Sequence, residues 1–204
     1  MSTARIIGGP LTLYYGAVGA AARANTVSID TPPASATWTL LGGGVSTDKR
    51  YYDEEGVTLG FDQTIEEEMV LHDTLPEKAF RVSEANTVAV TLKDWSLQAV
   101  AQAMGFITLN TAVPASGTLA ATQSVDLVRG FPVNEVSLLA RANYSPHDDG
   151  TQLPAVCELY FPRVYVSENG EAVFSKTSSM LPITFKVLAH ATKPYFNVKT
   201  ANKT

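Results

Sequence analysis

The sequence has very little cysteine and few charged residues. Cys157 is its one cysteine, so the chain cannot form an internal disulfide, and a cysteine-rich zinc site cannot be built from it. Charged residues make up 17% of the chain, compared with about 25% in a typical soluble domain. Hydrophobic residues reach 45%, which is too many for a disordered chain. We therefore expect a folded protein of 204 residues whose surface is partly covered by partners.

The sequence also lacks an excess of basic residues and any long apolar run. Lys and Arg total 15 against 20 Asp and Glu, which gives a net charge of −5. This balance disfavours a protein that grips nucleic-acid phosphates. No stretch approaches the roughly 20 apolar residues of a membrane-spanning helix, and the first residues contain no apolar segment typical of a secretory signal. We expect a soluble protein made in a cytoplasm.

Patterns typical of catalysis or metal binding are scarce as well. Two of the three histidines, His72 and His147, precede an aspartate, which could orient a general base. No G-x-S-x-G nucleophile turn accompanies them or His190. The glycines at 42–44 lack the lysine of a phosphate-binding loop. We expect no enzymatic activity, no cofactor and no metal site, and a buried, unreactive thiol at Cys157.

Strand patterns dominate the chain, and one helix is indicated. Asp94 is the expected helix cap, Leu97, Val100, Ala101 and Met104 form its apolar face, and Gly105 ends it. Strands and helices do not alternate along the sequence, so parallel β-α-β units are not expected. The sequence predicts a mainly antiparallel β protein, a sandwich or partial barrel with one helix. The expected strands span residues 12–15, 38–41, 57–71, 87–92, 125–128, 136–142, 156–166, 172–174 and 183–189.

Residues 57–71 show the clearest two-residue period. Adjacent side chains of a strand point to opposite faces, so this segment has one apolar face and one acidic face. We expect the apolar face to be buried and the acidic face to point away from the core; a solvated outer sheet face is the alternative reading. The apolar set is Val57, Leu59, Phe61, Ile65, Met69 and Leu71, and the other contains Thr58, Gly60, Asp62, Thr64, Glu66 and Glu68.

Charge is unevenly distributed along a chain that shows no composition break between two cores. Residues 48–94 hold twelve acidic and five basic residues, and residues 151–204 hold three acidic and six basic ones. The sequence predicts a single domain over 1–204, with an extended N-terminal arm at about 1–50 and a C-terminal tail at about 193–204.

The order of several segments resembles that of a siphophage major tail protein, the subunit of the tail tube. The segments that carry this resemblance cover most of the chain. They are GPLTLYYG at 9–16, WTLLG at 38–42, YDEEGVTLGFDQTIE at 52–66, TLKDWSL at 91–97, LYFPR at 159–163 and LPITF at 181–185.

The resemblance implies a fold, an assembly and a location. The fold would be two near-orthogonally packed antiparallel β-sheets flanked by one helix. Copies would form hexameric rings stacked into a tube in the virion tail, assembled in the host cytoplasm. DNA would pass through the lumen without specific binding, and the partners would be further copies, the tape measure protein and other tail proteins. An acidic lumen would repel phosphate.

Within that assembly the sequence suggests two sets of site residues. The expected lumen-facing residues are Asp62, Glu66, Glu68, Thr58 and Thr64. The oppositely charged segments would meet between stacked rings, with Asp53, Glu54 and Glu55 opposite Lys193, Lys199 and Lys203.

Two other functions remain compatible with the sequence. A distal tail or tail-completion protein would form one ring instead of a long tube. A non-viral β-sandwich carbohydrate-binding module would use Trp38 or Trp95 as a stacking platform. A hydrolase based on His72 or His147 is disfavoured because no nucleophile accompanies these residues.

Overall fold

The computed structural model describes residues 11–20, 37–42, 52–68, 78–93, 96–118, 120–126, 130, 132–142, 155–169, 173–174, 179–194 and 196–202. Its described strands and single described helix are β1 (Thr12–Gly16), β2 (Thr39–Leu40), β3 (Tyr52–Glu68), β4 (Lys78–Leu92), α1 (Leu97–Ala103), β5 (Glu135–Ala142), β6 (Ala155–Asn169), β7 (Val173–Phe174), β8 (Ser179–Val187) and β9 (Asn197–Asn202). This confirms the predicted mainly β class with one short helix.

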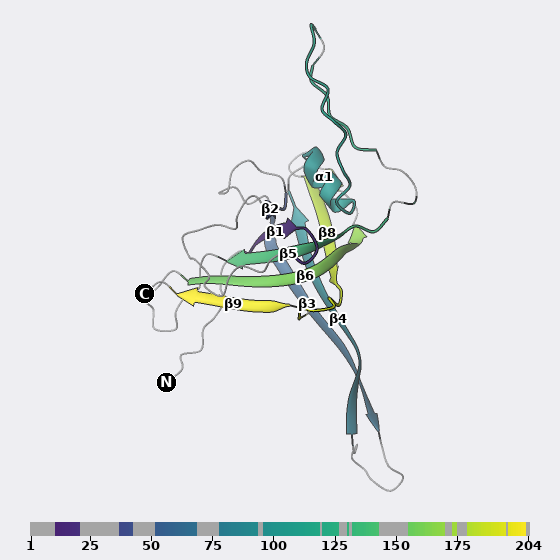
Figure 1. The fold of residues 1–204 in the computed structure, drawn as a ribbon, viewed down its shortest axis with the longest axis vertical. Coiled ribbons are helices and arrows are strands. Elements are labelled where there is room, and N and C mark those ends of the chain that lie inside the picture. Colours follow the sequence, from purple (N-terminus) through teal and green to yellow (C-terminus); the bar gives the residue numbers. More distant parts are fainter. Residues whose placement is uncertain are drawn as a thin grey trace.

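The strands form one antiparallel sheet, where the sequence analysis expects two. The strand order is β2-β1-β5-β6-β8-β4-β3; β9 pairs with β6, and the two-residue β7 pairs only with β8. The sheet turns at β6, because one edge of this strand pairs with β9 over its first half and with β8 over its second half. In Figure 1, β5, β6 and β9 run across the molecule while β8, β4 and β3 run steeply past them. A single bent sheet thus replaces the predicted pair.

The core lies between the two directions of the bent sheet. Every second residue of β8 and of the second half of β4 points into it, including Val88, Val90, Ile183 and Phe185. The facing strands contribute Leu13, Leu138, Ala140, Leu159, Phe161 and Val164, and α1 adds Ala99 and Ala103. Folding one sheet onto itself buries an apolar face that a flat sheet would leave in water.

Tyr52 connects the two ends of the strand order. Its hydroxyl accepts a hydrogen bond from the Leu13 N–H at 3.0 Å and lies 3.3 Å from the Leu41 carbonyl oxygen. Tyr52 belongs to β3, whereas Leu13 belongs to β1 near the other end of the sheet. This side chain therefore links β3, at one end of the bent sheet, to β1, next to the strand at the other end.

The helix lies where the sequence predicts it, but its cap and buried face differ. Ser96 is the N-cap, and its hydroxyl accepts from the Ala99 N–H at 3.1 Å; the expected cap, Asp94, lies outside the described residues. Met104 is 40% exposed, so the expected apolar face is wrong there. Gln102 is buried instead, because its amide accepts from the Gly42 N–H and donates to the Tyr15 hydroxyl. Gly105, at φ +92°, follows the helix as expected.

Two further predictions need correction, one about a strand and one about the C-terminal tail. Val125 and Asp126, the described part of the expected strand at 125–128, are not in a strand. The segment expected to be a C-terminal tail contains β9, which pairs with β6 from Asn197 to Asn202. Its pattern, Asn-Val-Lys-Thr-Ala-Asn, offers little apolar alternation, so the sequence carries no strong strand signal there.

Candidate functional site

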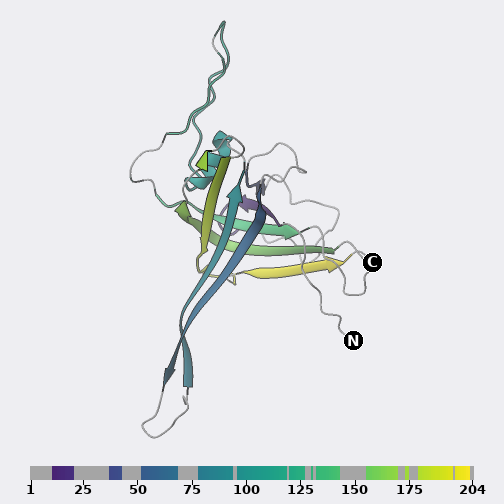
Figure 2. The ribbon, with the colours of Figure 1, turned by 180° about the vertical axis from the view of Figure 1, so that it is seen from behind.

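A long two-stranded hairpin projects from the body of the protein. Strands β3 and β4 pair from Val57↔Val90 to Glu68↔Lys78, and Figures 1 and 2 show their far ends extending well beyond the rest of the sheet. The first seven residues of β4 are exposed, and only its later residues alternate between buried and partly buried positions. We call residues 61–68 of β3 with 78–84 of β4 the distal hairpin.

The distal hairpin carries apolar side chains that its own chain does not bury. Phe61, Ile65, Phe80 and Val82 are 57%, 51%, 53% and 56% exposed. The expectation that Phe61 and Ile65 are buried is therefore wrong, because the strand continues past the end of the core. Phe61 keeps one contact with the body, since its ring centroid lies 5.7 Å from that of Phe196. Met69 and Leu71, also expected in the buried set, lie outside the described residues.

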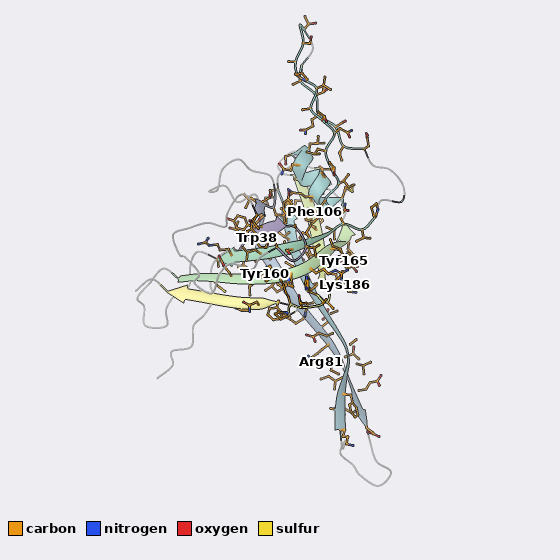
Figure 3. The ribbon with its side chains drawn as sticks, in the orientation of Figure 1. Trp38, Arg81, Phe106, Tyr160, Tyr165 and Lys186 are labelled. Carbon is orange, nitrogen blue, oxygen red and sulfur yellow. The ribbon has the colours of Figure 1, made fainter. Side chains whose placement is uncertain are left out.

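A β-bulge lies in the middle of the distal hairpin. Thr64 pairs with Ser83 and Ile65 with Arg81, which leaves Val82 without an opposite residue. A bulge increases the local twist of a strand pair, consistent with the turn of the two strands in Figure 2. Arg81, labelled in Figure 3, is placed on this part of the hairpin and pairs with Glu84 at 3.0 Å.

The five expected lumen residues lie along one strand. Thr58, Asp62, Thr64, Glu66 and Glu68 occupy every second position of β3, apart from Gly60, and all five are exposed. The distal hairpin as a whole holds the acidic residues Asp62, Glu66, Glu67, Glu68 and Glu84 and the basic residues Lys78 and Arg81. Its surface is therefore predominantly negative as well as partly apolar.

The face of β3, β4 and β8 that points away from the core continues this row. The sheet register aligns Thr58 with Ala89 and Thr184, and Gly60 with Thr87 and Lys186. These positions alternate with the buried Val88 and Phe185, so they point outward. A Cβ on Gly60 would collide with the Thr87 hydroxyl, which leaves little room for a side chain there. These outward positions form a mostly uncharged face, with Lys186 and its register partner Tyr165 at one side (Figure 3).

The expected contacts between rings involve residues that are only partly described. Asp53, Glu54 and Glu55 lie in β3 and Lys199 lies in β9, but their side chains fall outside the described part, as does all of Lys203. The Lys193 ammonium donates to the Gly19 carbonyl at 2.7 Å and lies 5.6 Å from the centre of the Tyr160 ring. Lys193 thus anchors its own chain, and any contact with another copy would compete with these bonds.

Two ion pairs between β5 and β6 were not predicted from the sequence. Arg163 holds Glu135 through two short contacts, Nε–Oε2 at 2.6 Å and Nη2–Oε1 at 2.7 Å. The hydrogen bond from Arg163 lowers the pKa of Glu135 below its usual 4.5. Arg141 and Glu158 oppose each other in the register and are 4% and 2% exposed. The sequence offers one sign of these ion pairs: within mostly apolar strands, the charged residues occupy positions on the face that points away from the main core.

Trp38 does not provide the stacking platform of a carbohydrate-binding module. It is 4% exposed, and its ring meets that of Tyr160 edge-on at 6.0 Å, inside a small cluster with Leu139. Figure 3 places Trp38 and Tyr160 in the body of the protein. Trp95, the other candidate platform, lies outside the described residues.

The candidate catalytic residues show no assembled site in the described part of the chain. His190 accepts a hydrogen bond from the Thr192 N–H through Nδ1 at 3.3 Å, whereas His72 and His147 lie outside that part. Cys157 is buried, and burial raises the pKa of its thiol, as expected for an unreactive cysteine. The described residues contain no group of three or more His, Cys, Asp or Glu that could hold a metal ion.

Comparison with known proteins adds no assignment: no family model matches the chain, and no curated protein matches it. Within the described part, no helix has the length and apolar character needed to cross a membrane.

Proposed function

We propose that the chain is a structural subunit of a phage tail tube, without enzymatic activity, that assembles into stacked hexameric rings in the virion. The observation that carries the proposal is the projecting hairpin, with four large apolar side chains that are all more than half exposed. Large exposed apolar side chains gathered on one element of a soluble protein mark an interaction surface. Here they lie on both faces of the hairpin, because Phe80 is opposite Glu66 and not Ile65. The resemblance of the segment order to siphophage major tail proteins names the kind of assembly.

The bent sheet is compatible with the fold that such a subunit needs. Its two strand directions enclose one core within a single sheet that is continuous through β6. In a ring, the outward faces of β3, β4 and β8 from neighbouring copies would lie side by side around the axis. The mostly uncharged face of these strands, together with Asp62, Glu66, Glu68, Thr58 and Thr64, would then line the lumen.

A lumen of this composition would suit the passage of DNA. Threonine, alanine and glycine offer no cationic group to a phosphate, and the carboxylates repel it. Lys186 and Lys78, which pairs with Glu68, are the exposed cations of this face among the described residues. The tape measure protein and other tail proteins would be the remaining partners.

Electron microscopy of the purified protein, together with sedimentation, tests the proposal. We expect hollow tubes of stacked rings that lengthen with protein concentration, because contacts along the axis do not close. A single ring that never stacks would favour a distal tail or tail-completion protein. A chain that stays monomeric at high concentration would overturn the proposal.

A further inference from the structure

A second projection leaves the molecule at the opposite end from the distal hairpin. Residues 107–118 and 120–126, which we call the arm, rise beyond α1 while the hairpin extends the other way (Figures 1 and 2). Two sets of backbone hydrogen bonds hold the arm as a narrow ribbon. Val113 and Thr122 exchange N–H···O bonds at 2.8 and 3.0 Å, and the Asn110 N–H donates to the Ser124 carbonyl at 2.9 Å.

From Asn110 to Ser124, the described part of the arm is exposed and carries no charge. Every described side chain from Asn110 to Ser124 is exposed, with Val113 at 61%, and residues 95–125 contain no Asp, Glu, Lys, Arg or His. An isolated two-stranded ribbon is marginally stable in water, and this ribbon has no apolar face against its own core. Such a segment gains stability by pairing with another chain.

One edge of the arm is suited to strand pairing. Because Thr122 directs its backbone groups toward Val113, the neighbouring Ala121 and Gln123 direct theirs outward. The side that contains Val113 is less suited, because Pro114 has no N–H to donate. The open edge of the arm therefore lies along residues 120–124.

The distal hairpin offers an edge that fits this segment. Strand β3 is the last in the strand order, and among the described residues its outer edge pairs with no other strand. Residues 57–68 contain no Lys, Arg or Pro, the residues that most often block an exposed edge. They do contain Asp62, Glu66, Glu67 and Glu68, so two β3 edges would repel each other, whereas an uncharged strand would not be repelled.

We infer that the arm of one copy adds as a strand to the outer edge of β3 in the distal hairpin of a second copy, with Ala121 and Gln123 pairing near residues 63–65. The inference rests on the proposed self-assembly. The two surfaces lie at opposite ends of one molecule (Figure 1), so they meet only head to tail between copies. Main-chain hydrogen bonds would supply the affinity, and the Thr, Ser and Gln side chains of the arm would donate to the carboxylates of β3.

Mixed cysteine cross-linking tests the contact. Gln123→Cys is mixed in turn with Gln63→Cys, Thr64→Cys and Ile65→Cys, each purified separately and then oxidised. The natural Cys157 is 2% exposed and does not compete. We expect a disulfide-linked dimer in the mixture with at least one β3 variant. Ser83→Cys is the matched control, because this exposed residue lies opposite Thr64 on the other strand of the same hairpin. No dimer with any β3 variant, or an equal yield with Ser83→Cys, overturns the inference.

A charge substitution in the otherwise natural chain gives a second readout. Ala121→Glu places a carboxylate against those of β3, so we expect at least a tenfold loss of polymer that high salt partly restores. Ala121→Gln has the same size without the charge and should assemble normally. Equal assembly of the two variants overturns the inference. If the natural protein forms tubes and the variants give no cross-link, the arm contact is wrong and the proposed function stands. If cross-linked dimers form but tubes do not, the arm contact stands and the proposed function is wrong. If neither tubes nor cross-links form, both are wrong.

Discussion

At the scale of single residues, exposure separates side chains of the same type into different roles. Phe161 and Phe185 are 1% and 0% exposed, whereas Phe80 is 53% exposed. All three residues lie in strands, but only Phe161 and Phe185 belong to the core. Burial therefore decides which of them stabilise the fold and which are free to contact another molecule.

Replacement of Phe185 by alanine should lower the free energy of unfolding by about 3–5 kcal/mol, because it removes a large side chain from a closed core. Phe80→Ala should change it by less than about 0.5 kcal/mol, as is usual for an exposed position. Urea denaturation at a protein concentration that keeps the chain monomeric measures both values. Equal losses for the two variants would contradict the assignment of the core.

The Glu135–Arg163 pair should make stability depend on pH. Arg163 lowers the pKa of Glu135 from 4.5, so the stabilisation is fully present above that value and is lost as the pH falls through the lowered pKa. The difference in unfolding free energy between the natural protein and Glu135→Gln should therefore be constant at about pH 6–7 and shrink at acidic pH. Urea titrations at several pH values measure it. A difference that stays constant down to about pH 2 would show that the carboxylate charge is not responsible.

At the scale of elements, β4 combines two structures in one strand. Its second half alternates buried and partly buried residues against β8, and its first half is exposed throughout. Backbone pairing with β3 continues across both halves, so the strand persists after the core has ended. The distal hairpin is therefore held by main-chain hydrogen bonds, and its apolar side chains contribute little to the stability of the monomer.

Substitution of both Phe80 and Val82 by serine should separate folding from assembly. Both side chains are more than half exposed, so the unfolding temperature of the monomer should change by less than about 3 °C. Assembly should fall sharply if these side chains become buried between copies. Thermal unfolding and analytical ultracentrifugation measure the two effects. As a control, Val18→Ser changes a 42% exposed valine away from the hairpin and should leave assembly unaltered.

At the scale of the whole molecule, the distal hairpin and the arm project from opposite ends of a bent sheet (Figure 1). Surfaces at opposite ends of a molecule favour heterologous, head-to-tail contacts. Such contacts generate open polymers when the rotation that relates neighbouring copies does not close into a ring. The acidic row on β3 would then repeat around every ring of a tube.

Replacement of Asp62, Glu66 and Glu68 by lysine tests the proposed lumen. All three side chains are exposed, so the fold should be retained, while each ring would gain cationic groups that bind phosphate. Phage assembled with this variant should eject DNA more slowly, by a factor that decreases as salt is added. Dye-release measurements on purified virions follow the rate, and the corresponding glutamine variant provides the uncharged control. Ejection at the natural rate in low salt would exclude a lumenal role.

The elements that could be predicted from the sequence are those whose structure follows from a local residue pattern. Strand patterns identify β5, β6, β8 and the second half of β4, whereas the exposed first half from Lys78 was not predicted; short-range chemistry predicts α1 and the glycine after it. The alternation of β3 also identifies the acidic row from Asp62 to Glu68. β9 escapes this reasoning because Asn197–Asn202 has little alternation and forms its strand by pairing with the distant β6.

The sequence by itself determined the mainly β class, the helix that ends before Gly105 and the two faces of β3, because each follows from neighbours within a few residues. Only the tertiary structure decided that the sheet is one bent surface, since this depends on β6 sharing one edge between β8 and β9. It also decided that Phe61 and Ile65 are exposed. An alternating pattern states which face is apolar, but the length of the strand relative to the core determines where that face stops being covered.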